Sequence, residues 1–149
     1  MITLGDPEEV AALFHRVMGM AEHPDVTQSL VYRGNDNSLQ AAVSFHHFNP
    51  RSCWVDIVTT KGFLPKELLF STFLYAFEQL ELVRLTFFVA ADNLKSIALV
   101  EGLGAIREAT LQDGCSSGTA YIYCLRPNEC LIWSRFNERR KRTPSTRSL

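Results

Sequence analysis

Two adjacent histidines, His46 and His47, are side chains whose chemistry allows proton transfer near neutral pH. They lie near the end of a predicted strand over residues 40–48. Neighbouring strand residues point to opposite faces, so we expect that the two rings cannot hold one metal ion together. One ring could line a substrate cleft at the end of the strand. The alternative is a half-exposed position without a chemical role.

A second group, Cys115 and Ser116, lies in a loop bracketed by Gly114 and Gly118. Turn chemistry explains this loop without invoking a nucleophile. The sequence has no zinc-site spacing, no catalytic-triad pattern and no Walker-type loop. We therefore expect no metal site.

The cysteines indicate a reducing compartment. There are four, with no C-x-x-C pair and without the density of a secreted, disulfide-bonded protein: Cys53, Cys115, Cys124 and Cys130. No basic-then-apolar export signal is visible, and the most apolar window, residues 68–77, is too short to span a bilayer. We expect a cytoplasmic protein that does not enter the membrane.

Periodicity and turn residues predict the elements that position these side chains. Asp6 and Pro7 are typical of a helix start, and Glu9 would complete a capping box. A strand over residues 2–4 precedes this helix, which runs to about Met20. Three strands follow as an antiparallel meander, over residues 30–33, 40–48 and 52–60.

The second half of the chain alternates helices and strands. A long helix begins near Pro65, and residues 83–90 are apolar on both faces, as expected of a strand buried on both sides. Asp92 and Asn93 can cap another helix, which Gly104 ends. Strands over 105–111 and 119–125 and a short helical segment over 128–136 complete the order. The predicted class is α/β, with a mixed sheet flanked by helices.

The charge is unevenly distributed. The formal net charge of the 149 residues is −1. Residues 1–134 carry nine basic and fifteen acidic side chains, whereas residues 135–149 carry six basic and one acidic. We expect a single domain over 1–134 and a basic C-terminal tail over 135–149. Such a tail often binds nucleic acid or an acidic protein surface, and a solvated tail is the alternative.

Five stretches of sequence in this order resemble a known superfamily. Residues 77–86 match the pattern Phe-x-Gln-Leu-Gly-x-x-Arg-Val-Thr, and residues 90–96 match Ala-x-x-Asn-x-x-Ala/Ser. Residues 100–109 resemble Glu-x-Leu-Gly-Phe-x-x-Glu-Gly, while 121–123 and 126–130 fit a closing strand and Arg-x-x-Glu-Cys. On these residues the chain resembles the GNAT N-acetyltransferase superfamily, and more closely the small acetyltransferase-like proteins of tailed bacteriophages and prophages.

The resemblance implies a site for acetyl-CoA as co-substrate. In this superfamily, acyl-CoA lies in a notch where two parallel strands splay apart, which here would be residues 52–60 and 83–90. Backbone groups near Val58 and Thr59 would bond the pantetheine arm. Lys61 and Gly62 would meet the pyrophosphate at the start of the following helix.

Three further side chains have an implied role and an alternative. Asn93 resembles the family residue that holds the CoA arm, although capping a helix explains it equally well. Ser96 would face the thioester, or else solvent. Asp56 lies mid-strand beside the notch and could act as a general base, directly or through water, or be an outward-facing polar residue.

The sequence also departs from the family pattern. The pyrophosphate loop, residues 60–65, has one glycine, and Val100 stands where many members have a tyrosine that protonates the leaving sulfur. Ala105 replaces the phenylalanine that usually follows Gly104. Two functions therefore remain open: acetyl transfer from acetyl-CoA to an unknown amine, or a catalytically inactive GNAT-fold phage protein of virion structure or assembly. A phage protein would work in the host cytoplasm or in the virion, with phage structural proteins as partners.

Overall fold

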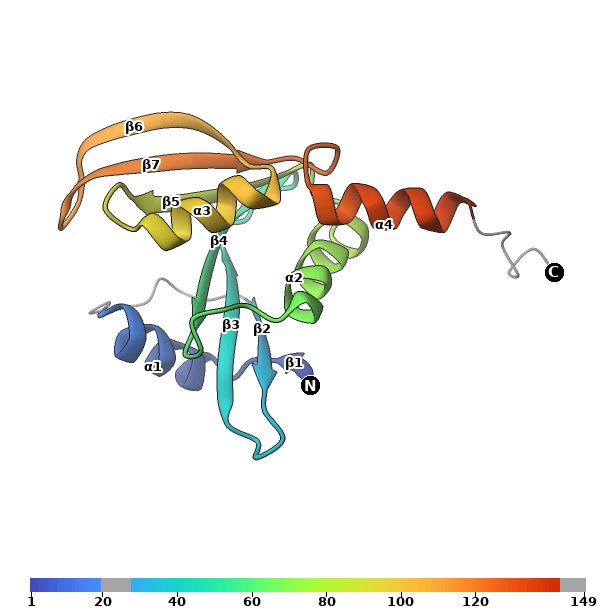
Figure 1. Cartoon of the computed structure of the whole chain (residues 1–149), viewed down its shortest axis with the longest axis horizontal. Coiled ribbons are helices and arrows are strands. Elements are labelled where there is room, and N and C mark those ends of the chain that lie inside the picture. The colour runs from blue at the N-terminus through green and yellow to red at the C-terminus, as the bar shows by residue number, and fades with distance from the viewer. Residues whose placement is uncertain (20–27, 143–149) are drawn as a thin grey trace. The chain divides into compact units, whose positions relative to one another are not determined.

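The computed structural model describes residues 1–19 and 28–142 of the chain (Figure 1). The chain divides into two compact units, the first over Met1–Phe88 and the second beginning at Val89. Met20, where the first helix was expected to end, lies outside the described residues. Within those residues, no helix is long and apolar enough to cross a membrane.

The first unit is built on a sheet with the strand order β1-β2-β3-β4-β5. Its strands are β1 (Ile2–Leu4), β2 (Gln28–Arg33), β3 (Leu39–His46), β4 (Ser52–Thr59) and β5 (Arg84–Ala90). The first four pair antiparallel, as the predicted meander requires. β4 and β5 pair in parallel, which needs a long crossover between them. This crossover is α2 (Lys66–Phe73), continued by the π-helical turn η1 (Leu74–Gln79).

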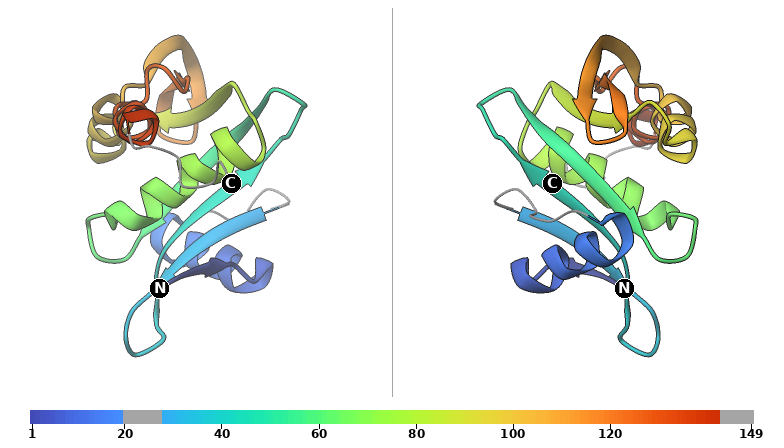
Figure 2. Two further views of the ribbon diagram at one scale, coloured as in Figure 1. Left: turned by 90° about the vertical axis from the view of Figure 1, so that its right-hand side faces the viewer. Right: turned by 90° about the vertical axis from the view of Figure 1, so that its left-hand side faces the viewer.

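Helices cover both faces of this sheet (Figure 2). α1 (Pro7–Met18) packs its buried side chains Val10, Leu13 and Phe14 against one face, where they form a core cluster with side chains of β2, β3 and β4. On the opposite face, Tyr75 of η1 packs edge-on against Phe45 of β3, with ring centroids 5.2 Å apart. Helices thus pack on both faces of the sheet, and this packing fixes the position of β4, the strand that pairs in parallel with β5.

The start of α1 agrees with the prediction except for Glu9. Asp6 caps the helix by accepting a hydrogen bond from the Glu9 amide at 3.1 Å, and Gly19 ends it in the left-handed region. The Glu9 carboxylate, however, does not complete a capping box. It accepts two hydrogen bonds from Arg33 of β2, at 2.9 and 2.6 Å. A bidentate guanidinium outcompetes a backbone amide for a carboxylate, because both partners are charged.

The second unit contains a helix, a hairpin and a terminal helix. α3 (Leu94–Leu103) follows β5, and β6 (Ile106–Cys115) pairs antiparallel with β7 (Gly118–Leu125). β7 lies between β5 and β6 in the strand order. Directly after β5, the Ala91 amide donates a hydrogen bond to the carbonyl oxygen of Thr119, near the start of β7. The strand order is β1-β2-β3-β4-β5-β7-β6, a mixed sheet in which β4 and β5 pair in parallel, which confirms the predicted fold class.

α4 (Leu131–Arg142) is longer than the sequence suggested. The expected helical segment ended at Phe136, before the basic run. The helix continues because Arg and Lys are good helix formers, and because the guanidinium of Arg140 lies over the rings of Trp133 and Phe136, at 5.9 and 5.5 Å. Part of the predicted basic tail is therefore helical.

Strand β5 also differs from expectation. The sequence indicated burial on both faces, yet Phe88 is 37% exposed while Phe87 and Val89 beside it are buried. One face of β5 is thus partly open at Phe88.

Replacing Gly104 should destabilise the protein, whereas replacing Gly102 should not. Gly104 has φ +105°, and a Cβ there would overlap the carbonyl oxygen of Glu129. We expect Gly104→Ala to cost about 1–3 kcal/mol of unfolding free energy, measured by urea denaturation. Gly102 lies in α3 with open space around it, so Gly102→Ala should stabilise by about 0.5–1 kcal/mol. Equal effects of the two substitutions would contradict this explanation.

The Glu9–Arg33 pair should stabilise the fold at neutral pH and not in acid. Arg33, chiefly through its hydrogen bonds, lowers the pKa of Glu9, so the stabilisation is present above the ordinary Glu pKa and is lost as pH falls through the lowered one. The pair is partly exposed, so we expect Glu9→Gln to cost about 0.5–1 kcal/mol at pH 7 and progressively less as the pH falls below the ordinary Glu pKa. Glu8→Gln, in the same helical turn, is the control and should show no such pH-dependent difference.

Candidate functional site

The parallel pairing of β4 and β5 stops early. It covers three residue pairs, Ser52–Arg84, Cys53–Leu85 and Trp54–Thr86. Beyond Trp54, β4 continues to Thr59 while still paired with β3 on its other side. Within the first unit, the β5-facing edge of β4 beyond Trp54 is therefore open. This is the splayed strand pair that the sequence predicted.

Val58 and Thr59, expected to bond a pantetheine arm, lie on this open stretch. The Val58 side chain is buried in the core cluster under α1, so only its backbone is available to a ligand. The Thr59 hydroxyl accepts from the Lys61 amide at 3.2 Å and donates to the Phe63 carbonyl at 2.8 Å. One side chain thus shapes the loop that follows β4.

That loop presents backbone donors. Gly62 has φ +75°, a left-handed conformation that suits glycine, and a Cβ there would meet nothing within 4 Å. α2 has Pro65 at its N-cap, with no side-chain cap. Among the described residues, the amides of Gly62, Phe63, Leu64, Lys66 and Glu67 have no hydrogen-bond acceptor. Free amides at a helix start form a favourable environment for an anion.

Lys61 adds positive charge to the same loop. Asp36, in the turn between β2 and β3, has a lowered pKa, mainly because the Ser38 hydroxyl and amide donate to it. Lys61 contributes to this lowering by its charge, so it lies near Asp36. Its ammonium group is thus near one carboxylate, and Lys61 belongs to the same loop as the free amides.

Asn93 and Ser96 lie together in the first turn of α3. The Asn93 side-chain oxygen accepts from the Ser96 amide at 3.2 Å, so Asn93 caps the helix. This is the alternative that the sequence left open for Asn93. Ser96 is half-buried. Val100, one turn further, is buried and offers no proton donor.

Asp56 is not an isolated polar residue of β4. Its Oδ2 lies 2.7 Å from Nε2 of His46 on β3. The two atoms are in close contact, although Nε2 of His46 has no aligned hydrogen bond among the described residues. The His46 side chain is 5% exposed and that of Asp56 22%. The carboxylate and the imidazole therefore share a partly enclosed site.

The second histidine joins this group, contrary to the prediction that the two rings point apart. Nδ1 of His46 is in hydrogen-bond contact with Nδ1 of His47. β3 ends at His46, and His47 has φ +51°, which breaks the strand alternation. No sequence signal indicated this turn. His47 is exposed, so the chain Asp56–His46–His47 runs from a shielded carboxylate to the surface.

The buried thiols are not candidates for nucleophiles. Burial raises the pKa of Cys53 to about 12 and that of Cys130 to about 11. Both are therefore protonated at neutral pH and lack the reactive thiolate. In the described residues no group of three or more His, Cys, Asp or Glu side chains could hold a metal ion.

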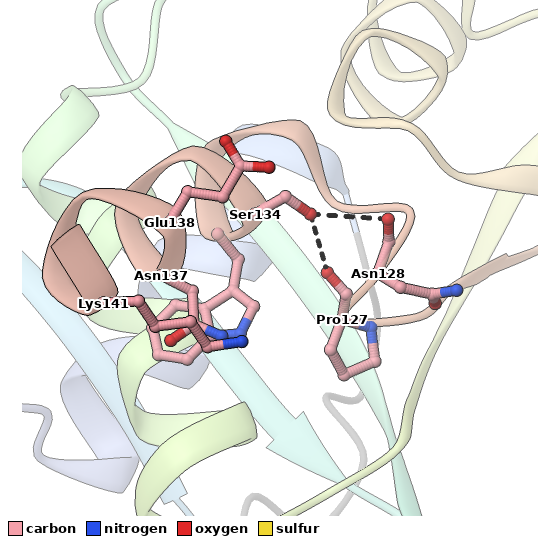
Figure 3. A pocket seen from close by; sticks show the side chains of 7 residues that line it. Pro127, Asn128, Ser134, Asn137, Glu138 and Lys141 are labelled. Carbon is pink, nitrogen blue, oxygen red and sulfur yellow. Dashed lines mark hydrogen bonds between the residues drawn. The ribbon is translucent and has the colours of Figure 1, made fainter.

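The second unit has a surface hollow of about 390 Å³ against α4 (Figure 3). Its lining residues are Pro127, Asn128, Trp133, Ser134, Asn137, Glu138 and Lys141. The Ser134 hydroxyl contacts the carbonyls of Pro127 and Asn128, at 3.2 and 3.4 Å. That hydroxyl therefore helps hold the preceding turn onto the helix and is not paired with a base.

Comparison with known proteins places this geometry in a fold family. The chain matches no protein-family model and no curated protein in sequence. Solved structures do match. Mutant forms of the spermidine/spermine N-acetyltransferase SpeG from Vibrio cholerae align with a TM-score of 0.70 at 17% identity, over 93% of this chain and 98% of that chain. The fold is that of the GNAT acetyltransferases.

Two other structures agree with this GNAT fold. The Vibrio cholerae spermidine N-acetyltransferase in complex with CoA and spermine aligns with a TM-score of 0.69 at 16% identity, over 86% of this chain and 96% of that chain. A probable acetyltransferase aligns with a TM-score of 0.56 at 28% identity, over 68% of this chain and 62% of that chain. At these identities the likeness establishes the fold alone.

Removing the Thr59 hydroxyl should loosen the loop after β4. Thr59→Val keeps the shape but loses both loop hydrogen bonds, each worth about 1 kcal/mol. We expect the Lys61 amide to exchange its hydrogen about fivefold to tenfold faster, as measured by NMR. Thr60→Val is the control, because the Thr60 amide still donates to the Gln40 carbonyl at 2.8 Å. Unchanged exchange at Lys61 in Thr59→Val would show that the hydroxyl does not hold the loop.

Proposed function

We propose that this protein is a GNAT-fold N-acetyltransferase that takes the acetyl group of acetyl-CoA and transfers it to an amine. The observation that carries the proposal is the open edge of β4 beyond Trp54, beside β5. Unpaired backbone groups on a strand edge favour an extended ligand that adds to the sheet. The amide-bearing pantetheine arm of CoA has this chemistry, and Val58 and Thr59 would bond it through their backbone.

The loop after β4 fits the pyrophosphate. Its free amides, the ammonium group of Lys61 and the unobstructed Gly62 lie at the start of α2, which has no side-chain cap. An anion there would accept hydrogen bonds that the protein does not supply. The loop has one glycine and one lysine, fewer such residues than the pyrophosphate loop of the family. The proposed contacts therefore come from backbone amides more than from side chains.

Asn93 can cap α3 and also hold the CoA arm. Its Oδ1 accepts from the Ser96 amide, but its side-chain NH₂ group is a separate donor. We propose that this NH₂ group donates to a carbonyl of the arm, and that the Ser96 hydroxyl faces the thioester. Capping then orients Asn93 for binding instead of competing with it.

The solved structure of another protein, with CoA bound, also supports the proposal. The Vibrio cholerae enzyme of this fold was solved with CoA and spermine. A GNAT fold therefore accommodates CoA together with an amine. We propose that Asp56 contributes to the deprotonation of the amine through His46, which its carboxylate contacts.

A catalytically inactive role is the second candidate, and Val100 favours it. A buried aliphatic side chain stands where many members have an acid for the leaving thiol. In this candidate a phage-encoded protein keeps the fold for virion structure or assembly. The basic end of α4 and the tail beyond it would contact nucleic acid or an acidic protein surface. The phage origin depends on the sequence resemblance alone.

Calorimetry with acetyl-CoA tests the first candidate. We expect saturable binding in the micromolar range, weakened about fivefold in Lys61→Glu, the size of effect typical of an exposed charge contact. Lys141→Glu on α4 makes the same charge change and should leave the affinity unaltered. Absence of binding at millimolar acetyl-CoA would exclude the enzyme and favour the assembly role.

A further inference from the structure

The end of the β4–β5 pairing is surrounded by side chains that suit an amine. Trp54 is the last residue of β4 paired with β5, and it pairs with His46 across β3. Asp56 lies two residues further along β4 and therefore on the same face. Phe88 of β5, two residues beyond Thr86, stacks on Trp54 at 6.5 Å between ring centroids. We call His46, His47, Trp54, Asp56 and Phe88 the apex patch.

The contacts within the apex patch define where its protons lie. Asp56 favours a proton on Nε2 of His46, because that nitrogen faces the carboxylate. With the proton there, Nδ1 of His46 would carry a lone pair, and its contact with Nδ1 of His47 would be a hydrogen bond that His47 donates. Nε2 of His47 is left with a lone pair on an exposed ring. The outer histidine is thus arranged to accept a proton.

A buried hydroxyl beside the patch has no partner in the protein. Ser44 pairs with Asp56 in the β3–β4 register, so their side chains lie on one face. Ser44 is fully buried, and its Oγ has no hydrogen-bond partner among the described residues. Leaving such a group without a hydrogen bond is unfavourable, and a bound polar group or water would remove that cost. This observation points to a ligand on the Asp56 face independently of the histidines.

The aromatic rings add a surface for hydrocarbon and for positive charge. Trp54 is half-buried, Phe88 is 37% exposed, and the ring of His47 lies 5.8 Å from that of Trp54. Faces of tryptophan and phenylalanine attract cations as well as methylene groups. A carboxylate, two aromatic faces and an accepting imidazole together match a primary ammonium group on a carbon chain.

We propose that the apex patch is the acceptor site, that it binds a primary alkylammonium ion, and that His47 removes the proton. This proposal rests on the proposed function, because the neutral amine is useful only beside a thioester. In the step, one N–H bond of the ammonium breaks, its electron pair stays on the amine nitrogen, and the proton moves to Nε2 of His47. His47 touches the amine. His46 and Asp56 are positioning residues that orient its ring and balance the new positive charge. From exposed His47 the proton passes to water.

Histidine NMR tests the proton arrangement without any turnover. In ¹⁵N-labelled protein at pH 8, we expect His46 as the Nε2–H tautomer and His47 as the Nδ1–H tautomer. Asp56→Asn should change the tautomer populations of both rings, because Asp56 contacts His46 and His46 contacts His47. His15→Gln, an exposed histidine on α1, is the control and should change neither. If Asp56→Asn changed the tautomer populations of His46 but not those of His47, the proposed arrangement of protons would be overturned.

Titration with n-hexylamine tests the ligand class, with 1-hexanol as the uncharged probe of equal length. We expect the amine to shift the His47 and Trp54 ring signals, with affinity reduced about fivefold in Asp56→Asn and in Trp54→Leu. Equal affinity for the alcohol, or no shift at His47, would overturn the acceptor site.

A catalytic readout then separates the two proposals. With n-hexylamine and acetyl-CoA as substrates, His47→Gln should lower kcat more than tenfold and leave acetyl-CoA binding unchanged. Failure of wild-type protein to bind acetyl-CoA would refute the proposed enzyme, while the NMR results would still decide whether the patch binds amines. Undiminished kcat in His47→Gln would refute His47 as the base in a working enzyme.

Discussion

Because β4 and β5 hydrogen-bond over three residue pairs and then part, one strand edge in the interior of the sheet has no strand partner. Backbone amides and carbonyls need such partners wherever water is scarce. The remaining architecture of the first unit follows from this constraint. The crossover through α2 and η1 makes β5 parallel to β4, and β3 holds the other edge of β4 along its length. α1 and η1 fix the sheet from its two faces, so the strands can separate without the sheet losing its order.

The same separation organises the chemistry of the first unit. At the far end of β4, Thr59 shapes a loop in which several amides have no acceptor among the described residues. At the point of separation, Trp54 and Asp56 present an aromatic ring and a carboxylate. In the proposed function, one strand would therefore lead from an anion-binding end to an amine-binding end. A transferase needs these two environments a fixed distance apart, and a strand is a rigid spacer.

Much of this fold could be predicted from the sequence, because local signals and tertiary packing agree. The Asp6 cap, the meander of β2 to β4 and the Gly104 helix end all follow from residue types at set spacings. Element lengths were less predictable. α4 runs past Phe136 because Arg140 packs over two aromatic rings, and Phe88 is exposed although its sequence neighbours are buried. Both outcomes depend on neighbours that periodicity does not encode.

The candidate site was predictable only where backbone position decides it. Asp56 and Thr59 lie on β4 as expected, but their partners come from β3 and from a turn. The meeting of His46 and His47 depends on one left-handed residue, and that feature restricts how the chain can vary. Asn, Asp and His tolerate positive φ better than other non-glycine residues. Only His among them has an imidazole ring, whose two nitrogens can donate at one and accept at the other. Position 47 is therefore constrained twice, by backbone shape and by proton chemistry. If His47 acts as proposed, Asn at this position would keep the bend and lose the base.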